Sequence, residues 1–156
     1  MNNNNEVISL LKESGLTLGS CESLTGGLFA STVTSYSGVS SFFKGSIVSY
    51  SSLIKRDVVG ISQDLIDKRG VVSHEVALEM ARLSKQLLEV DIAISFTGNA
   101  GPEAMENKEV GLVYIGLAYL DKLESFEYHF EGSRNEIREQ VVEAGFKLLK
   151  KYLGKN

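Results

Sequence analysis

Ser20-Cys-Glu-Ser-Leu-Thr-Gly-Gly-Leu-Phe-Ala30 is the stretch around which the rest of the chain is organised. It follows the short apolar run Leu16–Cys21 and leads into an amphipathic segment that extends to Tyr36, so a strand is predicted to turn into a helix near its two glycines. Such a junction exposes the N–H groups of a helix start and holds a turn side chain toward a ligand. Two interpretations of Ser23 follow: a nucleophile, or a helix cap.

Apolar periodicity on either side of this stretch predicts the remaining elements. Helices are expected at Val7–Lys12, Leu53–Val59, a brief segment between Ser62 and Gly70, Ser73 to Leu88 and Ser133–Leu153. Strands are expected at Ser46–Tyr50, Asp91–Thr97, Gly111–Leu120 and Leu123–Phe130. The last two strands are joined by too few residues for a parallel crossover, so they form an antiparallel hairpin. This order predicts an α/β protein, a three-layer α/β/α sandwich around a mixed, mostly parallel sheet.

Composition and charge narrow the class of protein. The 156 residues, with 43% hydrophobic and 23% charged, fit a single domain spanning residues 1–156, with residues 1–5 as a flexible tail. A net charge of −4 argues against a nucleic-acid surface. Neither a signal peptide nor a membrane-spanning run is visible, so a cytoplasmic protein without membrane contact is expected. The single cysteine, Cys21, and the lack of Cys/His clusters predict no metal site, and we expect no cofactor.

Three glycine-containing turns each follow an expected strand. They are Glu22–Gly27, Tyr50–Lys55 with Gly45 shortly before it, and Gly98–Pro102. Ligands of open α/β sheets bind outside the carboxyl ends of parallel strands, so the three turns are predicted to meet at one cleft. None of them is a Walker loop or a Gly-x-Gly-x-x-Gly sequence. Taken singly, each is better interpreted as a tight turn between packed elements.

Ser23, Tyr50 and Lys55 are the residue types of a metal-free acyl-transfer site. A serine hydroxyl needs a base to remove its proton, and Lys55 could serve if burial lowered its pKa, with Tyr50 relaying the proton. The alternative is that Ser23 caps the helix, Tyr50 packs at a strand end and Lys55 is solvated, and spacing alone favours it. Glu22 is either a general acid or support for Ser23, or a carboxylate that stabilises the helix dipole.

Arg134 and Arg138 lie four residues apart on one face of the last helix. Both could grip a phosphate or carboxylate, or they could pair with Glu131 or Glu139. The two histidines, His74 and His129, are interpreted as a helix-start residue and a strand residue rather than as catalysts.

Five ordered motifs resemble the CinA C-terminal domain family, whose enzymatic members are nicotinamide-mononucleotide deamidases (PncC-like). The resemblance spans nearly the whole chain, in what is expected to be a stand-alone form without the amino-terminal molybdopterin-binding-like domain of many members. The motifs are Glu22-Ser-Leu-Thr-Gly-Gly27; Lys44-Gly-Ser-Ile-Val-Ser-Tyr50 with Lys55; Gly70-Val-Val-Ser-His-Glu75 with Met80-Ala81; Thr97-Gly-Asn-Ala-Gly-Pro102 with Val110-Gly111; and Gly132-Ser-Arg134 with Arg138.

The resemblance implies an anticodon-binding-domain-like fold, a homodimer or larger homo-oligomer, and hydrolysis of nicotinamide mononucleotide to nicotinate mononucleotide and ammonia in pyridine-nucleotide salvage. It places the catalytic roles on Ser23, Tyr50 and Lys55. Substrate contacts are expected at Thr25, Gly26, Gly27, Gly45, Gly98, Asn99, Ala100, Gly101, Arg134 and Arg138. Backbone N–H groups in the turns at residues 25–27 and 98–101 are expected to bind the oxyanion or the phosphate, and the sequence leaves open which turn binds which.

The chain departs from the family pattern at three places. Glu103-Ala-Met-Glu-Asn107 replaces a usual glycine pair, Ser46 replaces a glycine, and Ser133 replaces an aspartate. The altered loop at residues 103–107 favours an alternative function, a non-catalytic nucleotide- or partner-binding module linked to competence and the DNA-damage response. The intact set of Ser23, Tyr50 and Lys55 favours the enzyme.

Overall fold

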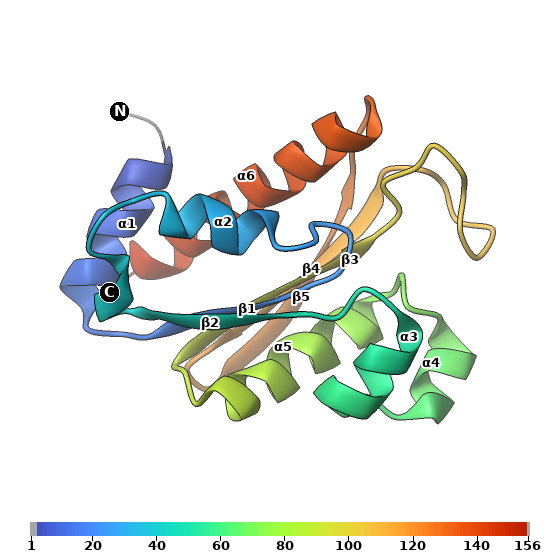
Figure 1. Cartoon of the computed structure of the whole chain (residues 1–156), viewed down its shortest axis with the longest axis horizontal. Coiled ribbons are helices and arrows are strands. Elements are labelled where there is room, and N and C mark those ends of the chain that lie inside the picture. Colours follow the sequence, from blue (N-terminus) through green and yellow to red (C-terminus); the bar gives the residue numbers. More distant parts are fainter. Residues whose placement is uncertain (1–2, 156) are drawn as a thin grey trace.

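The protein is built around a five-stranded sheet in the order β2-β1-β3-β4-β5, as seen in a computed structural model that describes residues 3–155 (Figure 1). The strands are β1 (Leu18–Glu22), β2 (Phe43–Val48), β3 (Ile92–Gly98), β4 (Leu112–Tyr119) and β5 (Lys122–His129). β1 pairs in parallel with both β2 and β3, whereas β4 is antiparallel to β3 and to β5. Four of the five strands therefore run in one direction, and the mixed, mostly parallel sheet is confirmed.

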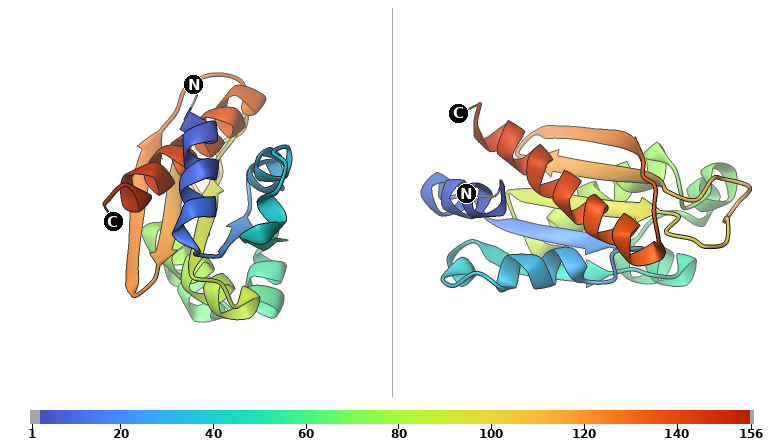
Figure 2. Two further views of the ribbon diagram at one scale, coloured as in Figure 1. Left: turned by 90° about the vertical axis from the view of Figure 1, so that its left-hand side faces the viewer. Right: turned by 90° about the horizontal axis from the view of Figure 1, so that it is seen from above.

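Helices cover both faces of this sheet, which confirms the three-layer α/β/α arrangement (Figure 1). On one face lie α1 (Asn3–Ser14), α2 (Leu28–Thr34) and α6 (Arg134–Leu153), and Figure 2 shows α6 crossing the sheet with α1 and α2 beside it. On the other face lie α3 (Ser52–Ile54), α4 (Gln63–Arg69) and α5 (His74–Leu88). Two further single turns, η1 (Val39–Ser41) and η2 (Lys55–Val59), precede β2 and follow α3.

The apolar core is divided by the sheet into two layers. Between α2, β3 and α6 the tilted ring of Phe29 packs against Phe96 and Phe146, with centroid distances of 5.2 and 5.1 Å. On the opposite face Val76 and Met80 of α5 pack against Cys21 of β1. The two central strands β1 and β3 are buried along almost their whole length, which explains the nearly continuous apolar run of β3.

Two expectations about element boundaries need correction. Helix α1 begins at Asn3, so residues 3–5 form its first turn rather than a tail, and Lys150 of α6 holds this turn through Asn3 (3.2 Å) and Glu6 (2.5 Å). Residues 1 and 2 of the expected tail lie outside the described residues. Strand β2 ends at Val48, so Tyr50 lies in the loop beyond the strand and not at its last position.

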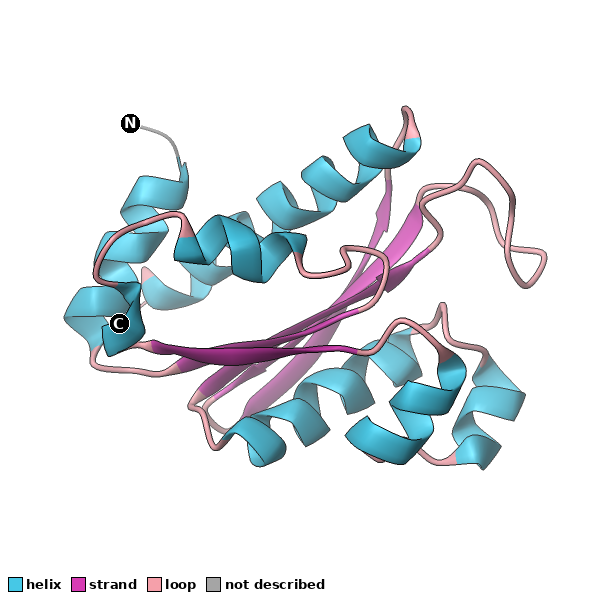
Figure 3. Cartoon of the chain, in the orientation of Figure 1, coloured by secondary structure: helices cyan, strands magenta, loops and turns pink. Residues whose placement is uncertain are grey.

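The loops after β1, β2 and β3 lie together at one end of the sheet, at the right of Figures 1 and 3. This placement follows from the parallel pairing of the three strands. Among the described helices, none combines the length and apolar character needed to cross a bilayer.

Candidate active site

A cleft of about 360 Å³ opens at this end of the sheet. The loops after β1, β2 and β3 and the first residue of α6 all contribute to its wall. The lining residues are Ser23, Leu24, Tyr50, Gly98, Asn99, Ala100, Gly101, Pro102, Glu103, Met105 and Arg134. The predicted convergence of the three turns on one cleft is therefore what the structure shows.

Ser23 lines the floor of this cleft and forms a buried pair with Lys55, which lies beneath it and does not line the cleft itself. The Lys55 Nζ atom donates a hydrogen bond to Ser23 Oγ at 2.9 Å. Its other acceptors are the carbonyl oxygens of Ser49 at 2.6 Å and Tyr50 at 3.4 Å. The three N–H donors of an ammonium group are thus matched by three oxygen acceptors. Lys55 is only 1% exposed and Ser23 is 8% exposed. The alternative interpretation, in which Lys55 is solvated, is therefore wrong.

Burial changes the protonation of Lys55. Desolvation lowers the pKa of its ammonium group from 10.5 to about 8, and this shift is partly opposed by the Cys21 thiol and the Glu106 carboxylate. A lysine with such a pKa is partly neutral near physiological pH, and a neutral amine accepts a proton. Lys55 opens the wide helical turn η2, where the N–H of Gly60 bonds back to the Lys55 carbonyl at 3.1 Å. Such turns are frequent at functional sites.

Glu22 anchors the segment that carries Ser23. Its carboxylate is fully buried and accepts five hydrogen bonds of 3.0–3.2 Å. The donors are the backbone N–H groups of Gly27, Phe29 and Ala30 and the hydroxyls of Ser20 and Ser46. Glu22 therefore caps α2, as its dipole interpretation predicted, and at the same time ties α2 to β1 and β2. It also occupies helix-start donors that a bound anion would otherwise use.

Ser46 belongs to this anchor because its hydroxyl reaches both Glu22 (3.2 Å) and Ser20 (2.7 Å). The departure from glycine at this position adds a donor to the buried carboxylate.

The turn that follows Ser23 is held from α6. Arg138 donates to the carbonyl oxygens of Leu24 (3.0 Å) and Thr25 (2.9 Å). Gly26 and Gly27 have φ values of +57° and +102°, which explains the glycine pair, since other residues rarely adopt them. The Thr25 side chain is fully buried, and its hydroxyl has no hydrogen-bond partner within residues 3–155. Thr25, Gly26 and Gly27 therefore shape the turn and do not line the cleft, unlike Leu24.

Tyr50 and Arg134 face each other across the mouth of the cleft. Arg134 donates to the Tyr50 hydroxyl at 3.0 Å and to the Gly101 carbonyl, so one guanidinium links the loops after β2 and β3. Tyr50 is 61% exposed, and among the described residues its hydroxyl bonds only to Arg134. Its backbone carbonyl is the part of Tyr50 that contacts Lys55. This geometry does not show the expected proton relay between Ser23 and Lys55.

The rest of the mouth comes from the rim loop, residues 99–111. The Asn99 side chain spans it, donating to the Lys108 and Glu109 carbonyls and accepting from the Gly101 N–H. The Glu106 carboxylate accepts from the N–H groups of Val71 (3.0 Å) and Val72 (3.2 Å), before α5. The Lys108 ammonium group donates a hydrogen bond to the Val72 carbonyl oxygen. Asn99 therefore braces the rim loop internally, and Glu106 and Lys108 fix it to the residues before α5.

The residues assigned from sequence thus divide into two groups. Seven line the cleft: Ser23, Tyr50, Gly98, Asn99, Ala100, Gly101 and Arg134. Six do not: Thr25, Gly26, Gly27, Gly45, Arg138 and Lys55, the last of which is buried against Ser23. Gly45 lies within β2 opposite Gly19, and a Cβ on it would meet Leu88 at 3.7 Å, so it faces the end of α5.

Sequence reasoning missed four lining residues: Leu24, Pro102, Glu103 and Met105. For Glu103 and Met105, the departure from the family pattern at residues 103–107 was the signal that the sequence offered.

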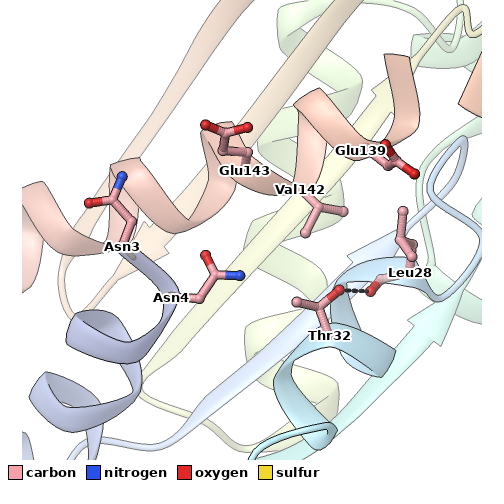
Figure 4. A pocket seen from close by; sticks show the side chains of 7 residues that line it. All are labelled: Asn3, Asn4, Leu28, Thr32, Glu139, Val142 and Glu143. Atoms are coloured by element: carbon pink, nitrogen blue, oxygen red, sulfur yellow. Dashed lines mark hydrogen bonds between the residues drawn. The ribbon is translucent and has the colours of Figure 1, made fainter. Parts of the chain in front are cut away.

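A second hollow of about 340 Å³ lies between α1, α2 and α6 (Figure 4). Its ionisable lining residues are Glu139 and Glu143 of α6, and its other polar side chains are Asn3, Asn4 and Thr32. Thr32 bonds to the Leu28 carbonyl of its own helix at 2.7 Å. The Thr32 hydroxyl is therefore not bonded to either carboxylate, whereas Ser23 is bonded to Lys55, so the cleft at Ser23 is the candidate active site.

Comparisons with known proteins agree with the family resemblance and with the fold. The model of the CinA C-terminal domain family matches residues 2–153. A protein of Bacillus thuringiensis (strain Al Hakam) named as competence-damage inducible is 47% identical over 149 residues, which are 95% of this chain and 36% of that protein. The chain therefore spans little more than a third of the length of the curated relatives it matches.

Solved structures are similar over the whole chain. A CinA superfamily protein from Klebsiella pneumoniae 700603 has a TM-score of 0.95 at 26% identity and covers 100% of both chains. The competence/damage inducible protein from Agrobacterium tumefaciens has a TM-score of 0.91 at 30% identity, covering 97% of this chain and 93% of that one.

Proposed function

We propose that this chain, which belongs to the CinA C-terminal domain family, is an amidohydrolase that converts nicotinamide mononucleotide to nicotinate mononucleotide and ammonia. The observation that carries the proposal is the 2.9 Å hydrogen bond between Lys55 Nζ and Ser23 Oγ at the buried floor of the cleft. A pure binding module has no need of a lysine that is almost fully buried against a serine hydroxyl. The nicotinamide substrate itself is taken from the family resemblance.

The first half of the reaction forms an acyl-enzyme. Neutral Lys55 takes the proton of Ser23 Oγ while that oxygen attacks the carboxamide carbon. The Lys55 ammonium then gives the proton to the amide nitrogen, the C–N bond breaks, and ammonia leaves. Burial supports both steps, because it brings the pKa of Lys55 to about 8, where donor and acceptor forms are both accessible.

The second half consumes water. Neutral Lys55 removes a proton from a water molecule that attacks the ester carbon, and then returns a proton to Ser23 Oγ as the acid product leaves. The net change is amide plus water to carboxylic acid plus ammonia, with the enzyme regenerated.

Two backbone donors are our candidates for stabilising the oxyanion. The N–H groups of Leu24 and Ala100 belong to residues that line the cleft, and neither donates to an acceptor within residues 3–155. The Leu24 N–H directly follows the nucleophile, which is the position used in nucleophile-elbow hydrolases. The Gly27 N–H is taken by Glu22 and the Gly26 N–H by the Ser23 carbonyl, so we assign the oxyanion role to Leu24 and Ala100.

The proposal is tested by measuring ammonia release from nicotinamide mononucleotide with the purified wild-type protein and with Ser23→Ala. The wild-type protein is expected to turn over and the variant to bind without turnover. Binding without ammonia release in the wild-type protein would instead support the non-catalytic module.

A further inference from the structure

The rim loop carries three carboxylates of which one is unpaired. Glu106 bonds to the N–H groups of Val71 and Val72 and to Lys108 (3.3 Å), and Glu109 pairs with His129. Glu103 is exposed, lines the cleft, and has neither a hydrogen bond nor an ion pair with another described residue. Its negative charge at the mouth of the cleft is therefore not neutralised by an ion pair with a described residue.

Arg134 is the one positively charged residue among the described residues that line the cleft with Glu103. Arg138 is turned to the carbonyl oxygens of Leu24 and Thr25, and Lys108 to that of Val72. With Lys55 buried on Ser23, the mouth holds one cation and one anion and has no surplus of positive charge for a phosphate dianion.

The direction of a bound substrate follows from the position of the nucleophile. The carboxamide must reach Ser23 at the floor, so the sugar and phosphate of a nicotinamide nucleotide extend outward past Tyr50 and Arg134 to the rim. The phosphate then enters the field of Glu103, which repels it, whereas the same field attracts the cationic N-ribosylated pyridine ring. Because both compounds carry the cationic ring, the repulsion of the phosphate alone sets the preference between nucleotide and nucleoside.

We infer that Glu103 is a specificity-determining residue that weakens phosphate binding and brings the dephosphorylated nucleoside, nicotinamide riboside, into the substrate range. The inference rests on the proposed function for the reaction, but its charge argument applies to binding alone. The anchored rim loop supports it, because Glu106 and Lys108 tie the loop that carries Glu103 to the residues before α5, and Glu103 lines the cleft.

The test compares kcat/KM for the mononucleotide and for the nucleoside in wild-type protein, Glu103→Gln and Asp121→Asn. Asp121 is an exposed carboxylate in the turn between β4 and β5, so its variant is matched in charge change but lies outside the cleft. In Glu103→Gln the kcat/KM for the mononucleotide, divided by that for the nucleoside, is expected to rise by about three- to tenfold at low salt. The rise should be smaller at high salt. Asp121→Asn should leave it unchanged. An unchanged ratio in Glu103→Gln overturns the inference.

Binding measurements separate this inference from the proposed function. Dissociation constants of the same two compounds are measured by calorimetry in Ser23→Ala and in the double variant that also carries Glu103→Gln. A shifted ratio of dissociation constants without any wild-type turnover retains the effect of Glu103 on phosphate binding and rejects the amidase. An unshifted ratio rejects the inference whatever the turnover, and failure of both compounds to bind rejects both.

Discussion

The floor and the rim of the cleft are built in opposite ways. At the floor Lys55 is buried, and each donor of its ammonium group has an oxygen acceptor. At the rim Tyr50 and Glu103 are exposed, and Glu103 has no partner among the described residues. Burial raises the energetic weight of every polar contact, whereas water screens contacts at the rim. The floor is thus suited to bond breaking. The rim is suited to discriminating among substrates through weaker, screened contacts.

The largest effects are expected at the floor. Ser23→Ala and Lys55→Met should each lower kcat/KM by about a thousandfold or more, because the nucleophile and its base act as one unit. Ammonia release under steady-state conditions measures the loss, and circular dichroism checks that the fold is retained. If Lys55→Met kept more than about a tenth of the activity, another base would have to serve Ser23.

A smaller loss is expected beneath the floor, at the Glu22 anchor. Glu22→Gln places an amide group among five donors, so α2 and the Ser23 turn lose alignment, and kcat should fall about 10- to 100-fold with little change in KM. The melting temperature should fall as well. Ser46→Gly is the matched control, because it removes one donor and should cost less than about fivefold. Equal losses in the two variants would contradict the anchoring role.

The pH dependence of the free energy of unfolding should reveal the energetic cost of burying Lys55. Its pKa is lowered from 10.5 to about 8, so the folded state binds fewer protons than the unfolded state between these values, and this group's contribution to stability rises with pH there. The free energy of unfolding of the wild-type protein relative to Lys55→Met should therefore increase by about 2 kcal/mol from pH 7 to pH 10. Urea titrations at several pH values measure it, and a constant difference would mean that Lys55 is not desolvated.

The smallest effect is expected at the rim. Tyr50→Phe removes a hydroxyl that bonds to Arg134 and not to Ser23 or Lys55, so kcat should fall by less than about fivefold. Initial rates at saturating substrate measure it, and Arg134→Lys, which keeps the charge, is the companion variant. A loss of a hundredfold or more in Tyr50→Phe would restore the proton-relay hypothesis and show that substrate binding draws Tyr50 to the floor.

The sequence could predict the floor better than the rim. Apolar periodicity and glycine turns place Ser23 and Lys55 on neighbouring loops at the carboxyl ends of parallel strands, and the sheet topology then brings them together. The glycine pair at residues 26 and 27 likewise indicates a tight turn, and both glycines have left-handed backbone conformations.

The remaining contacts depend on side-chain directions that only the packed fold decides. Arg134 meets Tyr50 across 84 positions in the sequence, and Arg138 reaches Leu24 across 114. The two arginines share a helix face, yet one reaches the cleft and the other turns to a loop backbone. No local pattern distinguishes them. Likewise, the five donors of Glu22 come from separate segments of the chain, on β1, β2 and the start of α2.

The pH dependence of kcat/KM for ammonia release tests most directly whether buried Lys55 is the base for Ser23. Because the pKa of Lys55 is lowered to about 8, the rate should rise with pH and reach half its maximum near pH 8. This inflection should be absent from the residual activity of Lys55→Met. A wild-type profile that is flat through this range, or that rises only near the ordinary lysine pKa of about 10.4, would contradict the account.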